Sequence, residues 1–286
     1  MTVTTVRPAE IDPLCRVPGG VWRTAAVRVR RRTGTHREHP DRPRLGADRR
    51  GGVLTVEHDL TPDELSDTLA VLLTEHLGEM LLGQQDFESV FTGIVRTTVP
   101  GGLEAWSRFY RNSMDALESG QSAFATIHRR AAALVTGPWL LDLGSCFGFF
   151  PLRMSRLGYE VTATDLSAPT MDLLARMSSR MGLPLRTVAC DAAQVPRPDG
   201  AADTVTALHL LEHLDPDTGD AVLAEALRLA RRRVVVAVPF EDEPQACYGH
   251  VRTFDMATLR ELGARFPGVR ATAFEHHGGW LVLDRV

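Results

Sequence analysis

Residues 139–150, WLLDLGSCFGFF, decide the fold of this 286-residue chain. The stretch begins with an apolar run of the length of a buried strand, and the acidic Asp142 lies near the end of that run. Gly144 and Gly148 follow, in a turn that opens a helix and lets the backbone approach a ligand closely. This order of strand, acid, glycine turn and helix predicts a nucleoside-binding site at the carboxyl edge of a parallel sheet.

Two further acids occupy positions that such a site needs. Residues 158–164 form the next predicted strand, which ends at Asp165, about 20 residues past the first glycine, where a carboxylate can accept both ribose hydroxyls. Residues 183–189 form a third predicted strand, and Asp191 follows it. A simple turn acid is the alternative for Asp191, but its register with the other two acids favours a binding role.

The motif DLGSCFG resembles the first motif of the class I S-adenosylmethionine-dependent methyltransferases, D/E-x-G-x-G-x-G. Gly144 and Gly148 match the outer glycines, and the small side chain of Cys146 replaces the middle one. The resemblance covers roughly residues 138–286 and implies S-adenosylmethionine (SAM) as the cofactor. It implies that the cofactor is bound by Asp142, Gly144, Cys146, Gly148, Asp165, Leu166, Asp191, Ala192 and His209.

Strands and helices alternate after the glycine turn, which predicts parallel pairing and a doubly wound sheet. The last two strands, residues 269–276 and 280–286, flank a Gly278-Gly279 turn and are predicted to form a hairpin. We therefore expect an α/β fold with a Rossmann-like, doubly wound sheet of seven strands that ends in an antiparallel C-terminal hairpin. The other elements expected in this part are strands 202–208 and 233–238 and helices 168–181, 215–230 and 255–266.

The chain divides into an N-terminal region, residues 1–136, and a SAM-binding methyltransferase domain, residues 137–286. The N-terminal region begins with a basic strand and loop segment, in which loose alternation predicts strands at 21–32 and 51–58. A helical cap is expected after it.

The helical cap begins with a clear signal. Thr61 and Glu64 form a capping box, and leucines at helical spacing predict one helix from there to Gly83. Residues 87–99 are mixed, and further helices are predicted at 103–118 and 121–135. Aromatic residues repeat along one side of the first of these helices, which favours core packing but also suits an acceptor pocket; Tyr110 is the candidate substrate residue among them.

Charge is unevenly distributed along the chain. Residues 1–50 carry 12 Arg against 5 Asp and Glu, a net charge of +7, so the remainder carries −11 of the total of −4. No aromatic residue lies between the arginines of residues 27–50 to stack on a base, so we expect no nucleic-acid partner and favour a solvated hairpin or loop. An anionic substrate is the alternative, and the role of this segment stays open.

Composition favours a cytoplasmic globular protein. The hydrophobic content is 44% and the charged content 24%, and no apolar run approaches the roughly 18 residues of a membrane helix. The first residues lack the pattern of a secretion signal, and the four cysteines show no ligand or disulfide spacing. All 32 basic residues are arginine, which we attribute to a GC-rich genome.

The segment His209-Leu210-Leu211-Glu212-His213 follows the fourth predicted strand of the sheet. It matches the zinc-peptidase pattern H-x-x-E-H, but that pattern needs a helix, and this one lies at a strand end. It also resembles the E-x-x-E-H stretch of ubiquinone-type O-methyltransferases, which implies a divalent cation such as Mg²⁺ on His209, Glu212 and His213. The alternatives are His213 as a general base, or a structural role for both Glu212 and His213.

Residues 239–255, PFEDEPQACYGHVRTFD, resemble the acceptor-side loop of these enzymes, with its G-H-x-R-x-F pattern. The resemblance implies a catalytic role for His250 beside His213. Arg252 is expected to pair with an acceptor carboxylate, or else with Glu241 or Asp242.

The resemblance as a whole implies a methyltransferase that acts on the hydroxyl of a small molecule or glycan. Residues 87–137 and the following GSCFGFFPLRMSRLG resemble the actinobacterial methyltransferases of the mycofactocin oligosaccharide, which implies a glucose hydroxyl. The alternatives are an O- or C-methyltransferase of a quinone, polyketide or other natural product, and a non-catalytic SAM-binding partner protein, which Cys146 favours. The acid before Gly144 and the C-terminal hairpin disfavour an NAD-dependent oxidoreductase, and the oligomeric state stays open.

Overall fold

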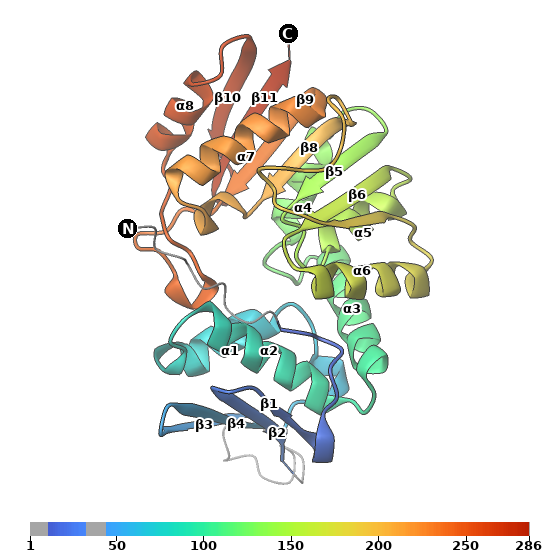
Figure 1. The fold of residues 1–286 in the computed structure, drawn as a ribbon, viewed down its shortest axis with the longest axis vertical. Coiled ribbons are helices and arrows are strands. Elements are labelled where there is room, and N and C mark those ends of the chain that lie inside the picture. The colour runs from blue at the N-terminus through green and yellow to red at the C-terminus, as the bar shows by residue number, and fades with distance from the viewer. Residues whose placement is uncertain (1–10, 33–43, 286) are drawn as a thin grey trace.

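The computed structural model of the chain describes residues 11–32 and 44–285. It is elongated, with a seven-stranded sheet and its helices at one end and a four-stranded sheet at the other (Figure 1). Helices α1 (Leu69–Leu77) and α2 (Gln84–Thr98) lie between the two ends, and a loop from the C-terminal half reaches down to them. Within the described ranges, no helix is long and apolar enough to cross a membrane.

The large sheet has the strand order β10-β11-β9-β8-β5-β6-β7. All neighbouring strands pair in parallel except β11, which runs antiparallel to both β9 and β10. The predicted Rossmann-like sheet with an antiparallel C-terminal hairpin is therefore confirmed. The strands are β5 (Trp139–Leu143), β6 (Glu160–Asp165), β7 (Arg186–Ala189), β8 (Ala202–Leu208), β9 (Ala230–Val238), β10 (Val269–Glu275) and β11 (Gly279–Arg285).

Helices cover both faces of this sheet. Buried side chains of α7 (Pro216–Leu229) and α8 (Met256–Ala264) form one core with β8, β9 and β11, and α4 (Ala125–Leu134) and α5 (Phe149–Arg156) form another with the opposite face. Three helices begin as their sequences indicate. Ser167, Asp215 and Asp255 accept a backbone N–H at the start of α6 (Ala168–Met181), α7 and α8, which stabilises each helix by about 1 kcal/mol.

The small sheet has the order β1-β2-β4-β3, from β1 (Val21–Arg23), β2 (Val27–Arg31), β3 (Leu45–Arg50) and β4 (Val53–His58). The single strand predicted over residues 21–32 is thus a two-strand hairpin, and β2 pairs in parallel with β4. Helix α2 packs directly on this sheet, because a β-carbon at Gly93 would come within 2.6 Å of Val29. A glycine is therefore required at that contact.

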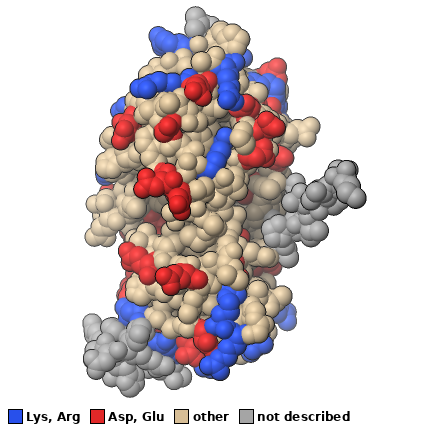
Figure 2. Space-filling model, turned by 90° about the vertical axis from the view of Figure 1, so that its left-hand side faces the viewer, with Lys and Arg blue, Asp and Glu red and all other residues tan. Residues whose placement is uncertain are grey.

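Several arginines of the basic segment form ion pairs with acids of the N-terminal region. Arg30 pairs with Glu57, Arg44 with Asp59 at 2.7 Å, and Arg49 with Asp86 at 2.5 Å. The remainder of the predicted loop, residues 33–43, lies outside the described residues. On the face drawn in Figure 2, basic side chains gather near the two ends of the molecule, and groups of acidic side chains lie among uncharged ones between them.

The continuous helix predicted from Thr61 to Gly83 is wrong. The capping box is present, with the Glu64 carboxylate accepting the Thr61 N–H at 2.9 Å, but it caps only the 3₁₀ turn Pro62–Glu64. The Asn112 side chain donates to the carbonyls of Pro62 and Leu65 at 2.9 and 2.8 Å. Those two carbonyls are therefore not free to accept the N–H groups of a continuing α-helix. The backbone is extended at Leu65, and α1 begins four residues later.

Of residues 87–99, which the sequence leaves mixed, all but the extended Val99 belong to α2. Its buried face includes polar side chains where apolar ones are expected. Arg96, for example, is buried and donates to the Pro13 carbonyl at 2.6 Å. The next helix, α3 (Gly102–Ser119), begins and ends within one residue of its prediction, and a short 3₁₀ turn, Gly78–Met80, follows α1.

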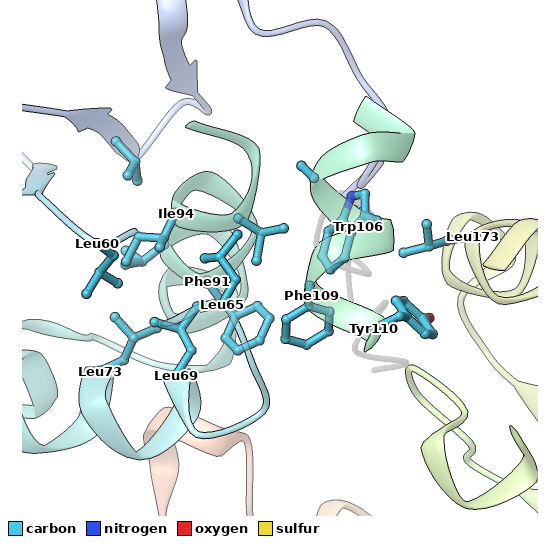
Figure 3. Close-up of a cluster of buried hydrophobic side chains, with 14 of the residues drawn as sticks. Leu60, Leu65, Leu69, Leu73, Phe91, Ile94, Trp106, Phe109, Tyr110 and Leu173 are labelled. Carbon is cyan, nitrogen blue, oxygen red and sulfur yellow. The ribbon is translucent and has the colours of Figure 1, made fainter. Parts of the chain in front are cut away.

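Aromatic side chains of α2 and α3 join the cap to the large domain (Figure 3). Phe109 lies at the centre, with its ring 5.4 Å from those of both Phe91 and Trp106 and also 5.4 Å from Phe147 of the glycine turn. Leu173 of α6 belongs to the same core. The aromatic spacing in α3 therefore serves core packing, which carries the cap onto the turn.

We expect Phe109→Ala to lower the free energy of unfolding by about 3–5 kcal/mol, because the fully buried ring leaves a cavity between the cap and the turn. Urea unfolding followed by circular dichroism measures this loss. Leu82→Ala is the control, since Leu82 is 77% exposed and its truncation should change stability by less than about 0.5 kcal/mol. Equal losses in the two variants would contradict the packing described.

Candidate functional site

The glycine turn links β5 to α5 through three residues in the left-handed region. The φ angles are 66° at Gly144, 49° at Cys146 and 72° at Gly148. A residue with a β-carbon is strained in this conformation. A glycine would therefore suit position 146, and the small side chain of Cys146 stands in its place. Cys146 is exposed at the surface of the turn.

Asp142 lies beneath the turn, not within an open cavity. Its side chain is buried, Oδ1 accepts a hydrogen bond from the Thr206 hydroxyl at 2.5 Å, and Oδ2 accepts one from the Ser145 hydroxyl at 2.7 Å. Burial raises the pKa of Asp142 to about 6. The carboxylate predicted to bind the cofactor therefore ties the glycine turn to β8.

Asp165 and Asp191 lie on neighbouring strand ends, because β6 and β7 pair in parallel with Asp165 opposite Ala189. Asp165 accepts the Cys146 N–H at 2.9 Å, which joins the second acid to the glycine turn. Asp191 is exposed and accepts the Ala193 N–H at 2.9 Å. Leu166 between these acids is 58% exposed. The edge thus offers two carboxylates and an apolar surface, as a nucleoside requires.

Tyr110, the first predicted substrate residue, lies in the aromatic core. Its side chain is fully buried, and its ring lies 5.2 Å from Phe149 and 5.8 Å from Phe109. The hydroxyl has no hydrogen-bond partner among the described residues, and burial raises its pKa well above the usual value. Tyr110 therefore belongs to the core between the cap and the turn.

The segment 209–213 forms a strand end and a short turn. His209 has a left-handed φ of 53°, and Leu211–His213 make one 3₁₀ turn, which lacks the helix that a zinc-peptidase motif needs. The His209 ring lies edge-on to Phe124 at 5.4 Å and lines a hollow of about 330 Å³ with Phe240 and others. Glu212 points inward and is fully buried.

His213 and His250 face each other from two separate segments. Their ring centroids are 4.8 Å apart at 86°, and burial lowers the pKa of His213. The Glu241 carboxylate lies 2.8 Å from Nδ1 of His250. Glu212, His213 and His250 each place one potential ligand atom within 4.8 Å of the others, whereas the predicted third ligand, His209, is outside this group.

Arg252, the second predicted substrate residue, contacts the segment of Glu212 and His213. Its Nε donates to the Leu211 carbonyl at 3.0 Å, and its guanidinium stacks 4.5 Å from the centre of the Phe254 ring. Burial lowers its pKa. Arg252 therefore holds the 3₁₀ turn in place.

The loop that carries His250 also contacts the cap. The Tyr248 hydroxyl donates to Thr74 Oγ1 at 3.1 Å, and its ring packs edge-on against Phe87 at 5.1 Å. Gly249 has a φ of 82°, and a β-carbon there would collide with Gln84 of α2. The contacts with Gln84 and Phe87 were not predicted because the sequence shows no helix signal at α2; the glycine in the G-H-x-R-x-F pattern is a local signal for them.

Comparisons with known proteins agree with this geometry. Residues 141–238, from β5 to the end of β9, match the family described as a methyltransferase domain. Demethylmenaquinone methyltransferase of Thermus thermophilus is 30% identical over 133 residues, 45% of this chain and 60% of that protein. The chloroplastic magnesium protoporphyrin IX methyltransferase of Arabidopsis thaliana is 24% identical over 178 residues, 58% of this chain and 53% of that protein. The chain thus spans less than two thirds of these curated relatives.

Among solved structures, a Pyrococcus horikoshii protein shares the fold, with a TM-score of 0.50 and 14% identity over 59% of this chain and 92% of that one. The resemblance to class I methyltransferases is therefore supported for residues 141–238, which contain the glycine turn and all three strand-end acids.

The buried Asp142 predicts a pH effect on stability. Its pKa is about 6 in the folded protein against 3.8 for the ordinary group, so the folded state binds the proton more tightly and loses stability as the pH rises from about 4 to 6. We expect Asp142→Asn to gain stability relative to wild type over that range, by about 3 kcal/mol for a shift of two pKa units. Urea unfolding at pH 4, 5, 6 and 7 measures the difference. A difference that is constant with pH would contradict the buried state of this carboxyl.

Proposed function

We propose that this chain is a SAM-dependent methyltransferase that transfers a methyl group to a hydroxyl oxygen of a small molecule or glycan. The observation that carries the proposal is the joint placement of two sites at one sheet edge. The glycine turn with Asp165 and Asp191 suits the cofactor. In the His213–His250 pair, His213 follows β8, the strand next to β5, and His250 lies in the loop after β9.

The residues at the strand ends fit SAM. Asp165 would hold the ribose hydroxyls, Asp191 with the backbone of Ala192 would hold the adenine, and the exposed Leu166 would be covered by the adenine ring. The turn around Cys146 would approach the methionine portion. When bound, SAM supplies a methyl group on a positively charged sulfur, so the protein has to align the acceptor and deal with its proton.

The paired histidines suit the removal of that proton. Burial disfavours the charged form of His213, so its imidazole is neutral near pH 7 and keeps a lone pair. The Glu241 carboxylate orients His250 by accepting from Nδ1, which leaves Nε2 as the free lone pair. Such lone pairs can accept the proton directly or hold a metal ion that acidifies the acceptor.

A glucose of the mycofactocin oligosaccharide is the acceptor that we propose. Its support is the resemblance of residues 87–137 and of the segment after the glycine turn, together with a chain that contains no lysine, as in a GC-rich host. The names of the two curated relatives favour the alternative, methylation of a quinone or tetrapyrrole. Cys146 in the turn favours the remaining alternative, a SAM-binding protein without turnover.

Calorimetric titration with SAM, S-adenosylhomocysteine and NAD tests the cofactor. We expect both sulfur nucleosides to bind with micromolar affinity and NAD not to bind. Asp165→Ala should weaken binding at least tenfold, because it removes the acceptor for the ribose hydroxyls. Asp172→Ala is the control, since Asp172 is an exposed acid whose carboxylate pairs with Arg176 on the outside of α6. Tighter binding of NAD than of SAM would contradict the proposed cofactor.

Acceptor classes are then separated with methyl-labelled SAM. Label in a glucose oligosaccharide supports the proposed acceptor, and label in a demethylated quinone or a porphyrin carboxylate supports the alternatives. Binding of SAM with no transfer to any of these would favour the non-catalytic protein.

The ionisation of His213 can be measured without an acceptor. We expect the ring protons of His213 in metal-free protein to titrate with a midpoint below the ordinary pKa of 6.5, because burial penalises the charged ring. Proton NMR between pH 4 and 8 measures the midpoint, and His213→Gln identifies the signal. A midpoint at or above 6.5 would contradict a neutral, buried imidazole.

A further inference from the structure

Glu212 is an unusual carboxylate for its surroundings. Its side chain is fully buried, and neither Oε1 nor Oε2 accepts a hydrogen bond from any described residue. Nδ1 of His209 lies 3.2 Å from Oε1, but outside hydrogen-bonding geometry. A buried carboxylate that accepts no hydrogen bond costs several kcal/mol, so this position favours a cation.

One of the two histidines beside Glu212 is oriented by an outer partner. The Glu241 carboxylate lies 2.8 Å from Nδ1 of His250, and the His213 ring lies edge-on to the His250 ring at 4.8 Å. Metal-ligating histidines are commonly held in this way, with one nitrogen on a carbonyl or carboxylate and the other on the ion. His250 therefore keeps Nε2 for a shared ligand.

The chain brings these side chains together with backbone contacts. The Val251 N–H donates to the Glu212 carbonyl at 2.8 Å, and Arg252 Nε donates to the Leu211 carbonyl at 3.0 Å. These two bonds tie the loop of His250 to the turn of Glu212 and His213. The ligand atoms lie within 4.8 Å of one another, whereas two ligands of one tetrahedral ion lie about 3.4 Å apart, so small side-chain rotations are needed to bring them onto a shared ion.

We propose that Glu212, His213 and His250 bind a divalent transition-metal ion of the zinc, cobalt or manganese type. Two imidazole nitrogens and one carboxylate favour such an ion over Mg²⁺, which prefers oxygen ligands. Three protein ligands leave open positions, where an acceptor hydroxyl would bind and become more acidic. That catalytic use depends on the proposed function, whereas the binding of the ion does not.

This site differs from the set that the sequence motif implies. His209 is replaced as a ligand by His250, because the His209 ring turns toward Phe124 and lines the neighbouring hollow. A transition-metal ion replaces the Mg²⁺ that the motif implies, because two of the three ligand atoms are imidazole nitrogens.

The site is tested on untagged, chelator-treated protein with metal ions alone. We expect one Co²⁺ per chain, seen as visible absorption bands, and calorimetric binding of Zn²⁺ but not of Mg²⁺. Glu212→Gln and His250→Ala should each weaken Co²⁺ binding at least tenfold. His209→Ala should bind as wild type does, and His277→Ala, at an exposed turn, is the surface control. Circular dichroism checks that each variant folds.

Two results would overturn the site. One is a wild-type protein that binds neither Co²⁺ nor Zn²⁺, and the other is loss of the ion in His209→Ala with retention in His250→Ala. If Glu212→Gln does not fold, His250→Ala decides, because His250 lies in a loop. Nucleoside binding separates this proposal from the function. A protein that binds SAM but no metal ion overturns the metal site alone. A protein that binds the metal ion but not SAM supports the metal site and contradicts the proposed methyltransferase function.

Discussion

The buried Asp142 carboxylate makes the pair of hydrogen bonds on which the rest of the site depends. It joins the Ser145 hydroxyl in the glycine turn to the Thr206 hydroxyl in the adjacent strand β8. The turn is thereby held at the carboxyl edge, where Asp165 accepts its Cys146 N–H. The following residues of β8 lead directly to Glu212 and His213. The Asp142 carboxylate thus links the glycine turn to the strand that leads to the proposed reaction centre.

The second constraint is the contact between the cap and the large domain. Phe147 inserts from the glycine turn into the aromatic cluster of α2 and α3, with ring centroids 5.7 Å from Phe91 and 5.3 Å from Trp106. On the other side, Tyr248 anchors the loop of His250 to the cap. The cap therefore contacts both halves of the site, and its packing stabilises the loop that completes the histidine pair.

Local signals predicted the elements of the large domain well. The strands over residues 139–143 and 202–208 have the predicted bounds, since short apolar runs bounded by turns leave few alternatives. Asp215 and Asp255 cap their helices because a cap depends only on neighbouring residues. The glycine turn and its acids were predicted from the same kind of local pattern.

Long-range contacts account for what the sequence did not predict. The helix expected from Thr61 is interrupted because Asn112, far along the chain, takes its carbonyls. Arg252 and Tyr110 have residue types that suit a substrate, but their packing partners come from other elements. His250 displaces His209 from the proposed metal set for the same reason, since only the folded loop brings it to Glu212.

A crystal structure with S-adenosylhomocysteine and Co²⁺ tests the central claim, that one sheet edge holds both cofactor and reaction centre. The account predicts ribose density at Asp165, adenine beside Leu166, and an anomalous cobalt peak between Glu212, His213 and His250. Nucleoside density away from the glycine turn, in protein that remains folded as described, would contradict it.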